Sequence, residues 1–390
     1  MTYDFDKIVE RRGTDCVKYD ALEKVYGSSD MIPLWVADMD FETPDFIMDA
    51  LRKRLEHPVL GYASEHPDYW PAVLDWQKNR NGWEIDPAHV AFIPGIVKGI
   101  GMAVNVFTKP GDKVIIQPPV YHPFRIVPEE NGREIVWNPL VLTDDGYHMD
   151  LEHLESIMDE RCKLLILSNP HNPAGIAWPV ETLVRLADIC ARHNVIVVSD
   201  EIHSDMYLFG HKHVPFATVS DTARRISVTF AAPSKTFNIA GVVTSYCVVP
   251  DDDLRARFFG WLHASEMDAK GIFPPIATVA AYRHGEEWLR QMLAYVEGNV
   301  RFVENFCRER IPVLKPMRPH ASFLVWLDCR GLGLGHDELD SLFRNKAGLA
   351  LNDGAMFGPG GDGFMRMNVG TRRAVLEEAL LRLEKAVGEI

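Results

Sequence analysis

Short apolar runs alternate with longer amphipathic segments from about residue 90 onward. The runs are rich in Val, Ile and Leu on every position, which is typical of strands buried on both faces, and helical spacing returns between them. This alternation predicts an α/β fold with a mostly parallel, seven-stranded sheet. The predicted strands cover residues 90–93, 113–117, 134–137, 163–168, 195–199, 226–231 and 245–249. The predicted helices between them include 97–107, 151–159 and 180–193.

The pattern changes in the last quarter of the chain, where strands become fewer. We expect a large domain over residues 46–281 and a smaller α+β domain over 282–390. Residues 1–45 lack strong periodicity, so we expect them to wrap onto the small domain. The elements predicted in the small domain are a long helix over 282–310, strands over 321–328 and 364–369, a helix from about His336 and a final helix.

Composition limits the classes of partner. The 390 residues carry 41 basic and 55 acidic side chains, for a net charge of −14. This balance argues against nucleic acid or an anionic membrane, because no excess of cations is present to neutralise phosphates. The start of the chain is charged throughout, and no run approaches the roughly 18 apolar residues of a membrane helix. Together with six widely spaced cysteines, these features predict a cytoplasmic protein with reduced thiols.

Polar residues collect in the loops that follow the predicted strands. Carboxyl ends of parallel strands meet at one edge of a sheet, where α/β proteins bind ligands. Asn172, Asp200 and Lys235 each follow a strand, and so does Tyr121. Gly95 leads into a helix N-terminus that suits an anion. Each feature alone is ordinary for a turn, a cap or a surface, but together they predict one crevice.

The order Asn172, Asp200, Lys235 resembles the signature of fold-type I pyridoxal-phosphate enzymes, the aspartate aminotransferase superfamily. Over nearly its whole length the chain is similar to the cystathionine β-lyase, or C–S lyase, branch. The motifs are PLWVADMDF (33–41), LGY (60–62), QPPVYHPF (117–124), LSNPHNPAG (167–175), SKTFNIAG (234–241) and GFMRMN (363–368). The resemblance implies pyridoxal 5'-phosphate and cleavage of cystathionine or related L-cysteine S-conjugates to thiol, pyruvate and ammonia.

The resemblance also implies roles for single residues. Lys235 would hold the cofactor aldehyde as a Schiff base and then move the substrate's Cα proton. Asp200 would keep the pyridine nitrogen protonated. Asn172 would donate to the phenolate oxygen and contact substrate, and Tyr121 would stack on the ring and approach the substrate. Arg366 would bind the substrate α-carboxylate through two parallel hydrogen bonds.

The remaining implied contacts concern the cofactor phosphate. It would rest on the N–H groups of Ile96 and Val97 and on the Ser234 hydroxyl. In this branch the tyrosine that matches Tyr62 reaches the phosphate of the neighbouring subunit. The resemblance therefore implies a homodimer with two shared active sites.

Three positions depart from the family pattern. Ala232 replaces a hydroxyl residue that many relatives place two before the Ser–Lys pair. His122 stands where a second tyrosine is common, and a histidine there is expected to titrate near neutrality. His203 stands where many aminotransferases have a tyrosine that bonds the phenolate oxygen, so it is a candidate for that role or for supporting Asp200.

Three other functions stay open. An aminotransferase shares every step up to the Cα carbanion, and no motif decides between it and the lyase, although the branch resemblance favours the lyase. A regulatory protein that binds the cofactor is a more distant alternative. A metal-dependent hydrolase is the third, but no H-E-x-x-H pairing is present and we predict no metal. It would use ligands from the group Asp200, Glu201, His203, Asp205, His211 and His213.

Overall fold

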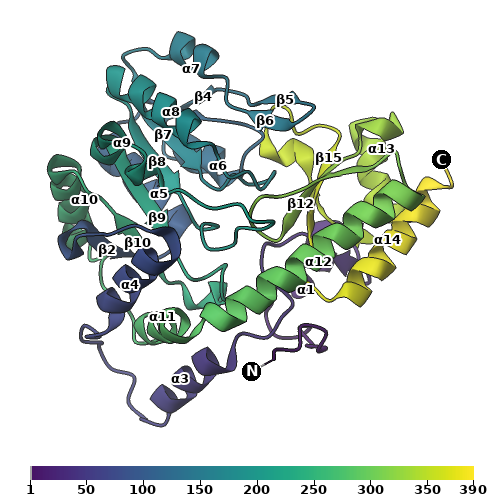
Figure 1. Ribbon diagram of the computed structural model, residues 1–390, viewed down its shortest axis with the longest axis horizontal. Helices are drawn as coiled ribbons and strands as arrows, with labels where there is room; N and C mark the ends of the chain where they lie inside the picture. Colours follow the sequence, from purple (N-terminus) through teal and green to yellow (C-terminus); the bar gives the residue numbers. More distant parts are fainter. Residues whose placement is uncertain (1) are drawn as a thin grey trace.

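The computed structural model describes residues 2–390, and its largest element is a seven-stranded sheet (Figure 1). Neighbouring strands are parallel except at one strand, residues 245–248, which is antiparallel to both of its neighbours. All seven predicted strands lie in this sheet, so the predicted fold class is confirmed. Across the sheet the order is β2 (Val90–Ile93), β10 (Ser245–Val248), β9 (Ser227–Ala231), β8 (Ile196–Asp200), β7 (Cys162–Ser168), β3 (Lys113–Ile116) and β4 (Glu134–Trp137).

Helices cover both faces of this sheet, which explains the unbroken apolar runs. Ile166 and Val198 pack into the core of one face, whereas their neighbours Leu165 and Val197 pack into the core of the other. A strand alternates its side chains between faces, so burial of both faces requires an apolar residue at every position. One face carries α5 (Ile96–Phe107), α6 (Pro123–Glu130) and α10 (Asp252–Ala264). The other carries α4 (Tyr69–Asn81), α7 (Leu151–Ile157), α8 (Val180–Arg192), α9 (Asp221–Ile226) and α11 (Phe273–His284).

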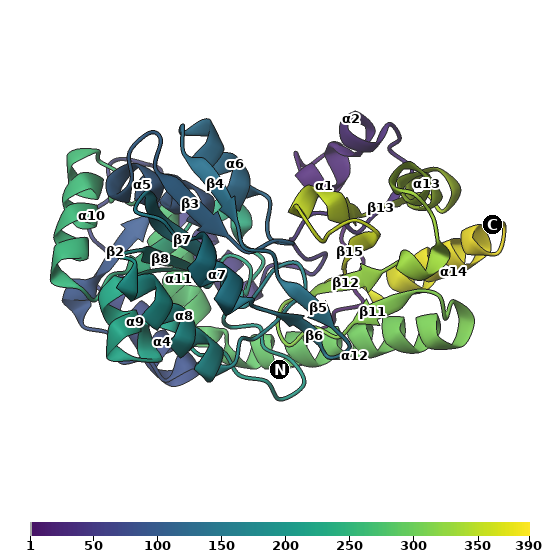
Figure 2. The same ribbon diagram turned by 90° about the horizontal axis from the view of Figure 1, so that it is seen from above.

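A second, smaller sheet lies beside the first (Figure 2). Its strands are all antiparallel and run in the order β11 (Lys315–Met317), β12 (Leu324–Asp328), β15 (Phe364–Asn368) and β14 (Asn352–Asp353). The helices of this part are α12 (Glu286–Arg310), α13 (His336–Ser341) and α14 (Arg373–Val387). A hairpin of β5 (Val141–Thr143) and β6 (Gly146–His148) lies between the two sheets in Figure 2.

The N-terminal segment forms α1 (Val17–Asp20), α2 (Leu22–Tyr26) and β1 (Ile32–Pro33). β1 pairs in parallel with β13 (Leu349–Ala350), so this segment adds a strand to the C-terminal part of the chain. Another segment, α3 (Asp45–Leu55), packs beside α11. The domain boundaries after residues 45 and 281 stay a prediction.

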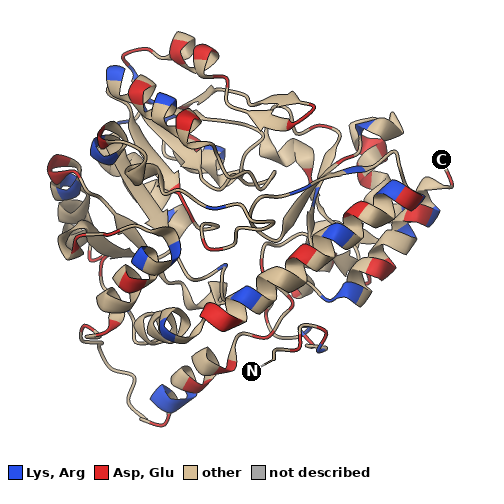
Figure 3. Ribbon diagram, in the orientation of Figure 1, with Lys and Arg blue, Asp and Glu red and all other residues tan. Residues whose placement is uncertain are grey.

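The long α12 runs from beside α11 to beside α14 (Figure 1). Its buried residues include Leu289, Met292, Val296 and Val300, whose spacing of three and four places them on one side of the helix. Acidic and basic residues are interspersed along the helix (Figure 3), and pairs such as Glu297–Arg301 lie one turn apart. Across residues 2–390, no helix has both the length and the apolar character needed to cross a membrane.

The prediction of one helix over 282–310 is wrong at its start. The chain forms two helices, α11 and α12, that meet at Gly285. A Cβ atom at Gly285 would lie 2.2 Å from Cε1 of Phe237 and 2.3 Å from the carbonyl oxygen of Ala281. Glycine is therefore required because the helix junction contacts the ring of Phe237, which lies in the loop after β9.

We expect Gly285→Ala to destabilise the protein by about 1–3 kcal/mol, because the added methyl group must displace the Phe237 ring or the helix backbone. The matched control is Gly260→Ala in α10, where nothing lies within 4 Å of the added Cβ. That change should be neutral or stabilise the helix by up to about 1 kcal/mol. Urea unfolding gives both values, and equal unfolding free energies for the two variants would contradict the close contact.

Candidate active site

A cavity of about 200 Å³ opens at the carboxyl ends of β7, β8 and β9. It lies where the sequence predicts a crevice, and most of the predicted site residues line it. The predicted residues that line the cavity are Ile96, Val97, Tyr121, Asn172, Asp200, His203, Ser234 and Lys235. Gly95, which leads into the predicted helix N-terminus, also lines the cavity. Residues with no predicted role complete the lining: Ala37, Ser168, Ile202, Ala240, Val243, Thr244 and Ser245.

Two groups of opposite charge line this cavity, the buried Asp200 and the partly buried Lys235. Burial, with a smaller contribution from the neighbouring Glu201, raises the pKa of Asp200 to about 7, against the opposing effects of the Ile202 N–H and of Lys235. Burial also lowers the pKa of Lys235 to about 8, although Asp38 and Asp200 oppose this. The Asp200 carboxylate accepts a hydrogen bond from the N–H of Ile202 at 3.1 Å. An amine with a pKa this close to neutrality can both take and return a proton.

Arg366 lies on β15 and enters the site from the smaller sheet. Its guanidinium donates to Asn172 Oδ1 at 3.0 Å, to the carbonyl oxygen of Trp35 at 3.0 Å and to Asn352 Oδ1. Burial lowers the pKa of Arg366 to about 10. Within residues 2–390 this buried cation forms no ion pair, and its Nε has no hydrogen-bond partner. A bound carboxylate would therefore supply the negative charge and the hydrogen-bond acceptors that Arg366 lacks.

The start of α5 offers a site for an anion. The helix begins at Ile96, directly after Gly95, whose φ of 115° is a conformation that favours glycine. The N–H groups of the first helical turn have no partner within the helix, and they point with the positive end of the helix dipole into the cavity. Ser234 lines the same cavity and supplies a hydroxyl group.

The two histidines that depart from the family pattern are both neutral near pH 7. Burial, with help from Arg366, lowers the pKa of His122 to about 4, so the expectation that it titrates near neutrality is wrong. Burial lowers the pKa of His203 to about 3, and the charges of Lys235 and Arg366 contribute. Nδ1 of each ring lacks a hydrogen-bond partner in the described part of the chain. His203 is therefore available as a neutral donor or acceptor.

Tyr62 lies apart from the cavity. It belongs to an irregular stretch between α3 and α4, and its side chain is fully exposed. Its predicted role at the site of a neighbouring subunit stays a prediction.

Four of the six side chains that suggested a metal site contact each other or other residues, and the remaining two, Asp200 and His203, line the cavity. His213 pairs with Glu201 at 2.8 Å, and Asp205 accepts hydrogen bonds from Trp76 and Thr236 at 3.0 Å each. His211 stacks on His320 with ring centroids 3.9 Å apart. In residues 2–390 no three His, Cys, Asp or Glu side chains come together as a possible metal site, so the hydrolase alternative loses its basis.

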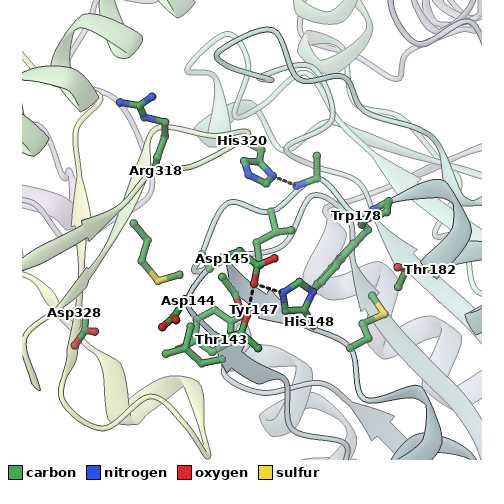
Figure 4. Close-up of a pocket in the computed structure, with 18 of the residues that line it drawn as sticks. Thr143, Asp144, Asp145, Tyr147, His148, Trp178, Thr182, Arg318, His320 and Asp328 are labelled. Carbon is green, nitrogen blue, oxygen red and sulfur yellow. Dashed lines mark hydrogen bonds and ion pairs between the residues drawn. The ribbon is translucent and has the colours of Figure 1, made fainter.

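A larger cavity of about 640 Å³ lies between the β5–β6 hairpin and the smaller sheet (Figure 4). Several of its charged side chains pair with each other or with nearby residues: Asp145 with His148, Arg318 with Glu304, and Arg330 with Asp328. Most of these groups are exposed to solvent. The smaller cavity is the candidate active site, because it contains the buried groups with shifted pKa values.

Sequence reasoning missed the contacts made by the segment around Trp35 and Ala37. The carbonyl oxygen of Ala37 accepts a hydrogen bond from Lys235 Nζ, as that of Trp35 does from Arg366. The motif PLWVADMDF marked this segment, but these contacts use backbone atoms, which residue types do not reveal. Asn352 was also missed; it stands opposite Arg366 in the neighbouring strand.

Comparisons with known proteins agree with this geometry. A family model described as aminotransferase class I and II matches residues 29–383. Cystathionine beta-lyase PatB of Bacillus subtilis (strain 168) is 45% identical, over 98% of this chain and 99% of that protein. A PLP-bound putative aminotransferase from Clostridium difficile 630 superposes with a TM-score of 0.96 at 40% identity, over 99% of this chain and 100% of that one. Cystalysin from Treponema denticola, which contains a pyridoxal 5'-phosphate cofactor, gives a TM-score of 0.94 at 32% identity over 100% of both chains.

The raised pKa of Asp200 predicts how stability depends on pH in the protein freed of any cofactor. The group has a pKa of about 7 in the fold against an ordinary value of 3.8, so the folded state binds more protons between these values. Wild type therefore loses stability as pH rises through this range, whereas Asp200→Asn has no proton to lose. The variant should gain about 3 kcal/mol relative to wild type between pH 4 and pH 8.

Urea unfolding at several pH values measures this difference. The control is Asp188→Asn, which changes an exposed carboxylate on α8. A stability difference for Asp200→Asn that does not vary with pH would contradict the buried, unpaired carboxylate.

Proposed function

Because this chain belongs to the aminotransferase class I and II family, we propose that it is a pyridoxal 5'-phosphate-dependent carbon–sulfur β-lyase. It would cleave cystathionine or related L-cysteine S-conjugates to a thiol, pyruvate and ammonia. The observation that carries the proposal is that Lys235 and Asp200 line one cavity, while buried Arg366 binds Asn172 at its edge. The family resemblance and the cofactor predicted from the motifs are confirmed by these relatives.

The charged groups around the cavity fit this cofactor. Asp200 is a buried carboxylate whose raised pKa reflects the lack of a strong cationic partner, and a protonated pyridine nitrogen would supply one. The N–H groups of Ile96 and Val97, with the hydroxyl of Ser234, would hold the phosphate. Ala232 adds no hydroxyl there, so the backbone N–H groups would carry more of this binding.

The ring of the cofactor would lie between side chains that line the same cavity. Tyr121 would stack on it, and Asn172 would donate to the phenolate oxygen. His203 is neutral and buried, and we propose it as a second contact on this side of the ring. When bound, pyridoxal phosphate supplies an electron sink for the negative charge left at the substrate Cα.

The residues of the chain then bind the substrate and move its protons. Arg366 binds the α-carboxylate through two hydrogen bonds and so fixes the orientation of the Cα–H bond. Lys235, once its amine is free, takes the Cα proton on Nζ, and its pKa of about 8 favours this exchange near neutral pH. The resulting ammonium can return the proton to the departing sulfur at Cβ. The released enamine hydrolyses to pyruvate and ammonia.

Transamination is the second candidate, because the neighbour from Clostridium difficile 630 is named a putative aminotransferase. Transamination uses the same binding of the α-carboxylate by Arg366 and the same removal of the Cα proton by Lys235. The match to a cystathionine β-lyase over almost the whole length of both chains supports elimination instead.

We also propose that the protein is a cytoplasmic homodimer with shared active sites. Val59 and Leu60 are more than half exposed, and the fully exposed Tyr62 follows them. A run of exposed apolar and aromatic side chains supports contact with a second copy of the chain. All six cysteines are free thiols, which supports a reducing compartment.

Lys235→Ala should lose covalently held cofactor and lower turnover by about a thousandfold or more, because no other amine replaces it. The control is Lys98→Ala, which changes an exposed lysine in the first turn of α5. Borohydride treatment followed by gel filtration measures covalent cofactor, and thiol release from L-cystathionine measures turnover. Wild-type cofactor content and rate in Lys235→Ala would refute the assignment.

Mixing two inactive variants tests the shared sites. In a dimer of one Tyr62→Phe subunit and one Lys235→Ala subunit, one site has both native residues and the other has neither. Random pairing should therefore restore about a quarter of the wild-type rate after the subunits are unfolded and refolded together. A rate no higher than the average of the two parents would show that Tyr62 acts within its own subunit or not at all.

A further inference from the structure

One segment of the N-terminal region contacts both charged side chains on which the proposed function depends. We call residues Leu34–Phe41 the strap. Its carbonyl oxygen at Trp35 accepts a hydrogen bond from Arg366 at 3.0 Å, and its carbonyl oxygen at Ala37 accepts one from Lys235. The two contacts are only two residues apart, so the strap joins the lysine of the larger sheet to the arginine of the smaller one.

Two asparagines bind the strap along its length. Asn238, three residues after Lys235, accepts from the N–H of Met39 at 2.9 Å and donates to the carbonyl oxygens of Met39 and Phe41. Asn368, two residues after Arg366, donates to the carbonyl oxygens of two other strap residues at 2.6 and 2.7 Å. Each charged residue therefore has an asparagine on its own segment that binds the same strap.

A cluster of four charges holds the other side of the strap. Arg11 donates to both carboxylate oxygens of Asp38, at 3.1 and 2.7 Å, to Asp40 at 2.7 Å and to the carbonyl oxygen of Met39 at 3.1 Å. Lys18 is fully buried and donates to Asp40 at 2.9 Å and to the carbonyl oxygen of Asp38 at 3.3 Å. Two cations thus bind three consecutive strap residues directly beside Ala37.

The position of this cluster indicates that it fixes the backbone beside the active site as well as anchoring the N-terminal segment. A buried ion pair gives little net stability, because desolvation offsets most of the attraction between the charges. Its geometry, in contrast, is specific, since one guanidinium group binds three neighbouring residues and fixes the position of the backbone. The residues fixed in this way adjoin the carbonyl oxygens that receive Lys235 and Arg366.

We propose that Arg11 and Lys18 are positioning residues of the active site, which hold the strap so that its carbonyl groups orient Lys235 and Arg366. The proposal rests on the proposed function for the roles of those two side chains. It assigns a role in substrate binding to residues whose own side chains lie outside the cavity. We call the contacts of Arg11 and Lys18 with the strap the latch. Its loss should weaken binding of the substrate carboxylate, because the carbonyl group of Trp35 would no longer hold Arg366 in a fixed position.

The test uses Arg11→Lys and Arg11→Gln in the holoenzyme. Lysine keeps the charge but has all its donors on one nitrogen atom, so it cannot reproduce the contacts that the two guanidinium nitrogens make with the strap, and both variants should behave alike. The spectral change on adding L-alanine, which has no leaving group at Cβ, gives its dissociation constant without turnover. We expect this constant to rise about tenfold in both variants. Lys18→Met should show the same direction of change.

The matched control is Lys7→Gln, which breaks an exposed ion pair with Glu42 at the end of the same segment. It should leave the dissociation constant unchanged. Hydrogen exchange of the strap supplies a readout that needs neither substrate nor cofactor. The latch predicts faster exchange over residues 34–41 in the Arg11 variants than in Lys7→Gln.

Different outcomes test the latch, its positioning role and the proposed function separately. Unchanged exchange in the strap of both Arg11 variants would show that Arg11 does not hold it, and would overturn the latch. Faster exchange with a wild-type dissociation constant would overturn the positioning role. A wild-type holoenzyme whose visible spectrum does not respond to L-alanine would refute the proposed function instead, whatever the exchange experiment gives.

Discussion

The site depends on one constraint: it places charged side chains away from water without balancing their charges from within the chain. Asp200 and the partly buried Lys235 line one cavity, and buried Arg366 lies beside it on Asn172. Burial raises the pKa of Asp200 and lowers the pKa of Lys235 and of Arg366, which favours the neutral form of each. Such an arrangement lowers the stability of the isolated chain, because each charge has lost its water without gaining an equal partner. The ligands of the proposed reaction provide the missing charges: a pyridinium, a phosphate and a carboxylate.

The fold explains how these groups meet. Asp200 ends β8 and Lys235 follows the adjacent parallel β9, so both reach the same edge of the sheet. Arg366 belongs to the other sheet, and its contact with Asn172 joins that sheet to the loop after β7. The strap then crosses between the two sheets and contacts both charged ends. Substrate binding is thereby linked to the relative position of the two parts of the molecule.

The sequence predicted the strands and most of the cavity well, because both depend on local features. Apolar runs mark strands buried on both faces, and the polar residue after each run marks its end. The break at Gly285 could not be predicted, since the ring that requires it belongs to Phe237, far away in the chain. The contacts of Trp35 and Ala37 could not be predicted from the sequence either, because they use carbonyl oxygens, which every residue type has. The low pKa of His122 comes mainly from burial, with a contribution from Arg366, and both arise only in the folded chain.

The central claim is that the buried amine and the carboxylate-binding arginine serve elimination from Cβ rather than transfer of the amino group. The most direct measurement follows pyruvate and free thiol together after the holoenzyme is given L-cystathionine and no keto acid. The account predicts equal amounts of both products over many turnovers. Failure to release thiol under these conditions, followed by amino transfer once a keto acid is added, would contradict it and identify an aminotransferase.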